Sequence, residues 1–113
     1  MASVEQCQRA LDDLASRLAE ADEQTKKRAI DRTVSCTLRD LDVVFGGELK
    51  GGELIDIRRV DTANAQVRMS MASDDLIKLV AGDLHLGSAW ATGRVRIEAS
   101  VRDLLRLRSV FSH

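Results

Sequence analysis

The stretch Asp74–Ser100, with the sequence DDLIKLVAGDLHLGSAWATGRVRIEAS, carries most of the information about the fold. It opens with a predicted helix over residues 74–81, in which Ser73 is the expected N-cap. Asp74 and Asp75 place negative charge at the positive end of the helix dipole. Gly82 ends this helix, because glycine readily adopts the left-handed conformation of a helix C-terminus.

A short helical turn and a strand follow within the same stretch. Residues 84–93 predict a turn of helix that bears Leu86 and Trp90 and ends at Gly93. In residues 94–99 apolar and charged side chains then alternate, which is typical of a half-buried strand. Its inward-facing residues are Val95, Ile97 and Ala99.

The chain closes with a predicted amphipathic helix. Its apolar face is wider than a single seam needs and comprises Val101, Leu104, Leu105, Leu107, Val110 and Phe111. Ser100 and Asp103 have the spacing of a capping box. Such a helix could complete the core, cover a cavity or dock a partner.

The N-terminal segment predicts another helix, capped by Ser3 with Gln6 at the capping-box position. Spacings of three and four separate the apolar residues Val4, Cys7, Leu11, Leu14, Leu18 and Ala21. This narrow stripe favours packing on the helix's own sheet, since three heptads are marginal for an isolated coiled coil. The alternative is a partner helix that forms a homodimer.

Between these helices the hydrophobic period changes to two, which predicts four strands at residues 33–38, 42–49, 53–60 and 65–71. "RDLD", "KGG" and "DTANA" are turn-like joints between them. The repeat GGELKGGEL at residues 46–54 suggests a phosphate loop, but strand-like sequence follows it where a helix is required. It is better interpreted as a hairpin with possible bulges.

The element order indicates an α+β fold, with a five-stranded, mostly antiparallel sheet and helices covering one face. The 113 residues suggest one domain. Residues 1–29 would supply the first helix and its connection, and residues 30–113 the sheet and the C-terminal helices.

Composition argues against several classes of function. The net charge is −1 and the only aromatic residues are Phe45, Trp90 and Phe111, so neither a global field nor a stacking platform favours nucleic acid. No apolar run approaches the length of a membrane span. No secretory signal is visible, so a cytoplasmic protein with two free thiols is expected.

No residue pattern points to catalysis, to a cofactor or to a metal. Asp74 and Asp75 are adjacent, so they do not face one another as a catalytic pair would. His85 has no second His or Cys at ligand spacing and no nucleophile partner within a known motif. A non-enzyme is therefore expected.

Together these segments resemble the sterol carrier protein type 2 domain family. The resemblance rests on the acidic-start helix of Asp74–Gly82, the short segment Ala89–Gly93, the strand Arg94–Ile97 and the leucine-rich helix Val101–Phe111. It is good over residues 63–111 and looser before them. The family's early tryptophan is missing here.

The resemblance implies a lipid-binding or lipid-transfer protein with an apolar tunnel between sheet and helices. Its ligand would be a fatty acid, acyl-CoA, phospholipid or sterol-like molecule. The implied lining residues are Phe45, Met69, Met71, Leu79, Leu86, Trp90, Ile97, Leu104, Leu105 and Phe111. The same side chains could instead fill a plain core, which would leave a non-catalytic dimerisation module with a collapsed cavity. The arginines of the last strand and helix form a solvated surface, and some of them could contact a lipid headgroup.

Overall fold

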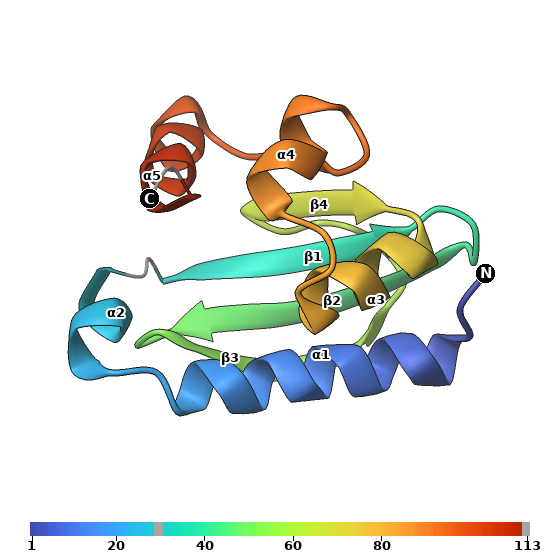
Figure 1. Ribbon diagram of the computed structural model, residues 1–113, viewed down its shortest axis with the longest axis horizontal. Helices are drawn as coiled ribbons and strands as arrows, with labels where there is room; N and C mark the ends of the chain where they lie inside the picture. Colours follow the sequence, from blue (N-terminus) through green and yellow to red (C-terminus); the bar gives the residue numbers. More distant parts are fainter. Residues whose placement is uncertain (29–30, 112–113) are drawn as a thin grey trace.

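The computed structural model describes residues 1–28 and 31–111, and for residues 25, 26, 28 and 107–111 it describes the backbone alone. Helices and strands follow one another along the chain in nearly the predicted order (Figure 1). In order they are α1 Val4–Ala19, α2 Glu23–Arg28, β1 Arg32–Leu38, β2 Val43–Lys50, β3 Glu53–Val60, β4 Val67–Met71, α3 Ser73–Ala81, α4 Leu86–Ala91, β5 Arg96–Glu98 and α5 Val101–Phe111. The short helix α2 was not predicted, although its Glu, Gln, Lys and Arg residues are good helix formers.

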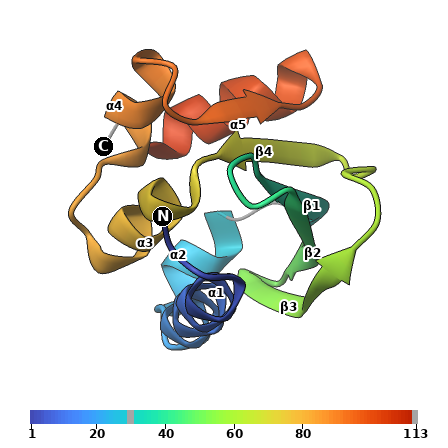
Figure 2. The same cartoon turned by 90° about the vertical axis from the view of Figure 1, so that its right-hand side faces the viewer.

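The strands form one five-stranded sheet in the order β3-β2-β1-β4-β5. Three of the four pairings are antiparallel, and β1 with β4 is parallel. The predicted α+β fold with a mostly antiparallel sheet is therefore confirmed. The parallel pair arises because residues 61–66, of which 61–65 were expected to form a turn-like joint, carry the chain from the edge strand β3 across the sheet to β4 (Figure 2).

The glycine-rich repeat forms the predicted hairpin between β2 and β3. Gly51 and Gly52 lie in its loop with φ angles of 60° and 80°, and two positive φ angles are what a tight type I′ hairpin turn requires. The pairing register shifts between Gly46 and Glu48, so the bulge is present as well.

Helix α1 begins with the predicted capping box. The backbone N–H of Gln6 donates to Ser3 Oγ at 3.1 Å, and the backbone N–H of Ser3 donates to Gln6 Oε1 at 2.8 Å. Cys7 and Leu11 are buried in the core, and Leu14 packs against it. Because α1 contacts β3 and α3 of its own chain, its apolar stripe is used within the molecule.

Helix α3 begins differently from the prediction. Ala72 is the N-cap residue and Ser73 is the first helical residue, so the assignment of Ser73 as N-cap was wrong. Asp40, in the turn after β1, caps the helix from outside: the backbone N–H and the hydroxyl of Ser73 donate to its carboxylate at 2.9 and 2.6 Å. The Ser73 hydroxyl lowers the pKa of Asp40. Gly82 ends α3 in the left-handed conformation, as predicted.

The sheet is strongly curved, and the helices and the crossing segment lie on opposite sides of it (Figure 2). Helices α1 and α3 lie on the concave side, whereas residues 61–66 pass over the convex side. Helices α4 and α5 lie together along the edge of the molecule opposite α1 in both views. The tightly packed core lies against the concave face and includes Leu38, Val43, Phe45, Met71 and Leu76.

Candidate functional site

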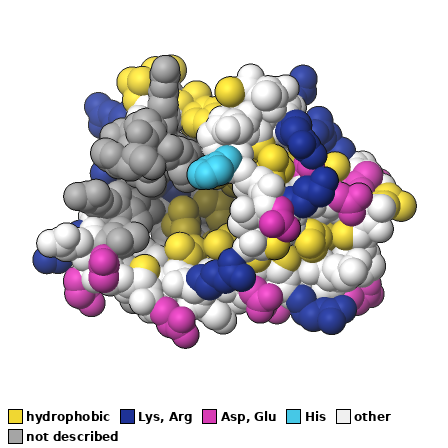
Figure 3. All heavy atoms as spheres, in the orientation of Figure 1, with side chains coloured by type: hydrophobic (Ala, Val, Ile, Leu, Met, Phe, Trp, Pro, Cys, Tyr) yellow, Lys and Arg dark blue, Asp and Glu magenta, His cyan; other side chains and the backbone are white. Residues whose placement is uncertain are grey.

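The candidate site is a hollow on the concave side of the sheet. Figure 3 shows this side as a depressed surface with hydrophobic side chains at its floor. In the matching view of Figure 1, the hollow lies over β1 and β2, bordered by α1 on one side and by α3 and α4 on others. We refer to it below as the apolar hollow.

Burial changes sharply between two neighbouring rows of side chains on this face. In one row Val43, Leu38 and Met71 lie side by side on β2, β1 and β4, and all three are buried. Two residues away along the strands, the next row begins with Phe45 on β2, which is also buried, and continues with Cys36, Met69 and Ile97 on β1, β4 and β5.

These three apolar side chains are only half buried, although they share the face that the helices cover. Strand alternation places them on the concave side, the side of the sheet on which the hollow lies. From this shared side we infer that Cys36, Met69 and Ile97 contribute to its floor. Phe45, which pairs with Cys36 from β2, is sealed from solvent and marks where the packed core begins.

The thiol of Cys36 reports a weakly polar environment at this floor. Burial raises its pKa from an ordinary value of 9.0 to about 12, so the group stays neutral at physiological pH. Burial also raises the pKa of Cys7, which lies in the packed core. Since a thiol acts as a nucleophile through its thiolate, neither cysteine is prepared for covalent chemistry.

An ion pair fastens α5 to the sheet. Arg32, at the start of β1, donates from Nε and Nη2 to the two carboxylate oxygens of Asp103, both at 3.0 Å. The hydrogen bond from Arg32 lowers the pKa of Asp103. The backbone N–H of Asp103 donates to Ser100 Oγ at 3.2 Å, so the predicted spacing provides a cap while the Asp103 carboxylate turns to the sheet.

The structure distributes the ten residues of the predicted lipid site over three environments. Phe45 and Met71 are core residues. Packed against the core and half buried are Met69, Leu79, Leu86 and Ile97. Trp90 and Leu104 are half buried on α4 and α5 outside that core cluster, and Leu105 is 61% exposed. The side chain of Phe111 lies outside the described residues. The lining role of this set stays a prediction.

Cys36, which we infer to lie at the floor, was absent from that set. The alternation in TVSCTL had already placed it on the inner face with Val34 and Leu38. What the sequence lacked was the register between strands, because only the pairing of Cys36 with Met69 shows that both belong to one half-buried row.

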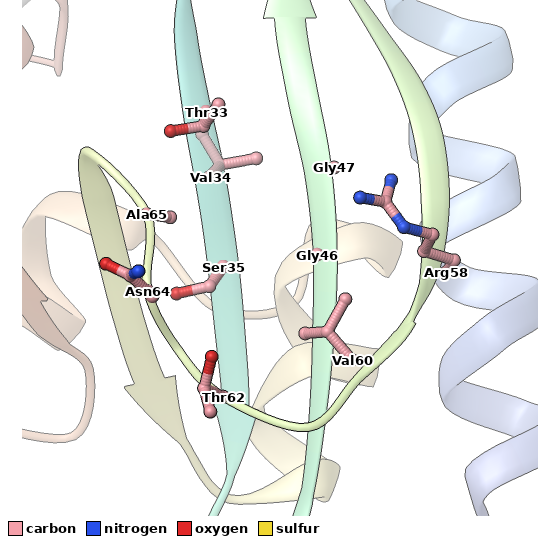
Figure 4. Close-up of a pocket in the computed structure, with 10 residues that line it drawn as sticks. All are labelled: Thr33, Val34, Ser35, Gly46, Gly47, Arg58, Val60, Thr62, Asn64 and Ala65. Carbon is pink, nitrogen blue, oxygen red and sulfur yellow. The ribbon is translucent and has the colours of Figure 1, made fainter.

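Two further cavities contain none of the ten predicted residues. One, of about 250 Å³, lies on the convex side beneath the crossing segment (Figure 4). Its walls mix apolar residues and glycines with the polar residues Thr33, Ser35, Arg58, Thr62 and Asn64. The other, of about 350 Å³, is a groove between α1 and α3, across which Arg17 donates to the carbonyl oxygen of Val80. Both are lined by charged or polar side chains as well as apolar ones, whereas a lipid site is lined predominantly by apolar side chains.

The ionisable groups near α3 serve structural contacts. Asp75 accepts from Arg94 Nη2 at 2.6 Å, and Asp74 lies 3.3 Å from the terminal amine of Met1. Within residues 1–28 and 31–111, no cluster of three His, Cys, Asp or Glu side chains could hold a metal ion. Among the helices described, none is long and apolar enough to cross a membrane.

Comparison with known proteins shows which family and which solved structures this chain resembles. The model of the SCP-2 sterol transfer family matches residues 11–112. The palmitated SCP2L2 of Aedes aegypti is 15% identical, with a TM-score of 0.66 and coverage of 99% of this chain and 96% of that one. The sterol carrier protein-2 of the same organism, solved with palmitate, is 18% identical, with a TM-score of 0.61 and coverage of 99% and 97%.

A third similar structure is the sec-alkylsulfatase Pisa1 from a Pseudomonas species. It is 24% identical over 87% of this chain, with a TM-score of 0.62, but the chain spans only 14% of that enzyme. A search of curated proteins found no match. At these identities the structural likenesses establish the fold.

Proposed function

The chain belongs to the SCP-2 sterol transfer family, and from this membership we propose that it binds the alkyl chain of a lipid in the apolar hollow and carries it between surfaces. The half-buried row of Cys36, Met69 and Ile97 is the observation that supports this most. In a filled core these side chains would be sealed like Leu38 and Met71 in the next row.

A fatty acid is the ligand class that fits the hollow best. Two proteins of the same fold were solved with palmitate, and the floor offers apolar atoms with a neutral thiol. Each buried methylene contributes about 0.8 kcal/mol. A site that covers ten methylenes would therefore gain about 8 kcal/mol, before the entropic cost of immobilising the ligand.

The proposal includes that the chain performs no chemistry of its own and acts in the cytoplasm. Support for the first part comes from the ionisable groups already described. Asp75 and Asp103 each engage an arginine, and Asp40 caps α3. The cysteine pKa values are raised, whereas a catalytic thiol needs a lowered one.

A homodimer built on α1 is less favoured. Cys7, Leu11 and Leu14 of the helical stripe pack inside their own chain, so little of that stripe remains for a partner helix. Light scattering of a variant with charged residues at Leu11 and Leu14 would test for such a dimer. Because Leu11 is a core residue, that variant would report on folding as well.

The proposed function is tested by displacing a fluorescent fatty acid with palmitate. In Met69→Gln a carboxamide would enter the floor, and a buried amide without a partner costs about 1–3 kcal/mol. We expect palmitate affinity to fall by about tenfold or more. Arg68→Gln is the matched control, since Arg68 is the exposed neighbour on the same strand, and it should bind as the wild type does. Equal affinity for both variants would exclude the hollow as the site.

A further inference from the structure

Helix α5 presents an exposed surface that combines apolar and basic side chains. Val101 is 75% exposed and Leu105 is 61% exposed, and Arg102 and Arg106 are exposed beside them. At 100° per residue these four positions span an arc of about 140°, with the apolar pair at one side and the arginines at the other. We call these four residues the outer face of α5.

The outer face is turned to solvent by a specific anchor on the other side of the helix. Asp103 is only 4% exposed and forms the bidentate ion pair with Arg32 of β1. Leu104, next to it, is half buried. Val101 and Leu105 are therefore held away from the core, because the side that carries Asp103 is fixed to the sheet.

Charge on the outer face is only partly balanced, since Arg106 helps to lower the pKa of Asp103. Among the described residues, ion pairs join Asp103 with Arg32, Glu98 with Arg68, Asp75 with Arg94, and Asp74 with the terminal amine of Met1. None of the pairs in that part of the chain involves Arg102 or Arg106. The sequence adds Arg108 to the same helix, so α5 carries an excess of positive charge.

We propose that the outer face of α5 docks on an anionic lipid bilayer. Valine and leucine next to arginines are the composition of a helix that lies in a membrane interface, with apolar side chains among the acyl chains and arginines at the phosphates. Because Arg32 ties α5 to the sheet that floors the apolar hollow, docking would bring the hollow close to the bilayer. Membrane docking rests on the proposed function only in its biological purpose, which would be to load or unload a lipid.

The test is flotation of the protein, as the full chain, with vesicles of phosphatidylcholine alone or of phosphatidylcholine with phosphatidylglycerol at 3:1. The double variant R102Q/R106Q removes the two arginines, and V101S/L105S removes the apolar pair. Controls with matched chemistry on other faces are R9Q/R58Q and I55S, whose residues are also exposed. All these positions are on the surface, so folding should be preserved, and far-ultraviolet circular dichroism verifies it.

The wild type is expected to float with anionic vesicles, and more weakly with neutral ones or in high salt. An arginine near an anionic surface contributes about 1 kcal/mol, so R102Q/R106Q should lower partitioning by about thirtyfold. V101S/L105S should lower it by at least about tenfold, and both controls should match the wild type.

Equal partitioning of all variants, or no flotation of the wild type with anionic vesicles, would overturn the proposal. Neutral vesicles that bind as tightly as anionic ones would overturn it too. Displacement of fluorescent fatty acid by palmitate, measured on the same preparations, separates the two ideas. Intact palmitate binding without flotation refutes docking alone, whereas flotation without palmitate binding refutes the proposed function alone.

Discussion

The two cysteines allow the same substitution to be made in a filled and in a hollow part of the interior. Cys7 is fully sealed at the centre of the packed core. Cys36 is half buried on the floor of the apolar hollow, between Phe45 on one neighbouring strand and Met69 on the other. Replacing each by phenylalanine adds the same volume to both environments.

The expected costs differ because only one site has room for a ring. At Cys7 the added atoms meet close-packed neighbours, and overpacking of this kind costs about 1–3 kcal/mol or more. At Cys36 the ring can extend into the hollow, where burying its apolar surface at about 25 cal/mol per Å² offsets local strain. We expect the stability of Cys36→Phe to stay within about 1 kcal/mol of the wild type.

Urea unfolding, followed by the fluorescence of the single tryptophan, measures both free energies of unfolding. The same proteins are then titrated with palmitate, and Cys36→Phe should bind at least about tenfold more weakly because the ring occupies part of the site. If both variants lose the same stability, the interior at Cys36 is as full as at Cys7. That result would refute the assignment of a hollow.

Two other outcomes follow from the titrating groups. Arg32 lowers the pKa of Asp103 from its ordinary value of 3.8, so their ion pair stabilises the fold above that pH, and this contribution is lost as the pH falls further. In urea titrations Asp103→Asn should therefore be less stable than the wild type at pH 7, and the difference in the free energy of unfolding should shrink towards pH 3. A difference that stays constant with pH would argue against the ion pair. A rise in the Cys36 pKa from 9.0 to about 12 lowers the thiolate fraction at pH 8 by about a thousandfold. In a Cys7→Ser variant, iodoacetamide should therefore label Cys36 at least about a hundredfold more slowly in the folded protein than in urea. Equal labelling rates would contradict the raised pKa of this thiol.

Local features of the fold were predictable because their causes are local. The capping box of Ser3 and Gln6 and the left-handed Gly82 each depend on residues within one turn. Strand alternation likewise identified the inner face that carries Cys36 and Met69. These signals need no knowledge of which elements become neighbours.

Features that depend on distant segments were not predictable from pattern alone. The cap of α3 comes from Asp40, 33 positions before Ser73, and the neighbouring serine offered a plausible local cap instead. The parallel pairing of β1 with β4 leaves no mark in the alternation of either strand. The anchoring of α5 through Asp103 also required the sheet to bring Arg32 within reach, and it turns Val101 and Leu105 outwards.

Native mass spectrometry of the full chain with added palmitate tests most directly whether the apolar hollow holds a lipid. We predict a complex of one palmitate with one chain for the wild type, and a strongly reduced complex for Cys36→Phe at the same palmitate concentration. A wild-type spectrum that shows only the unliganded chain at excess palmitate would contradict lipid binding. Equal complexes for the wild type and Cys36→Phe would contradict the location of the site.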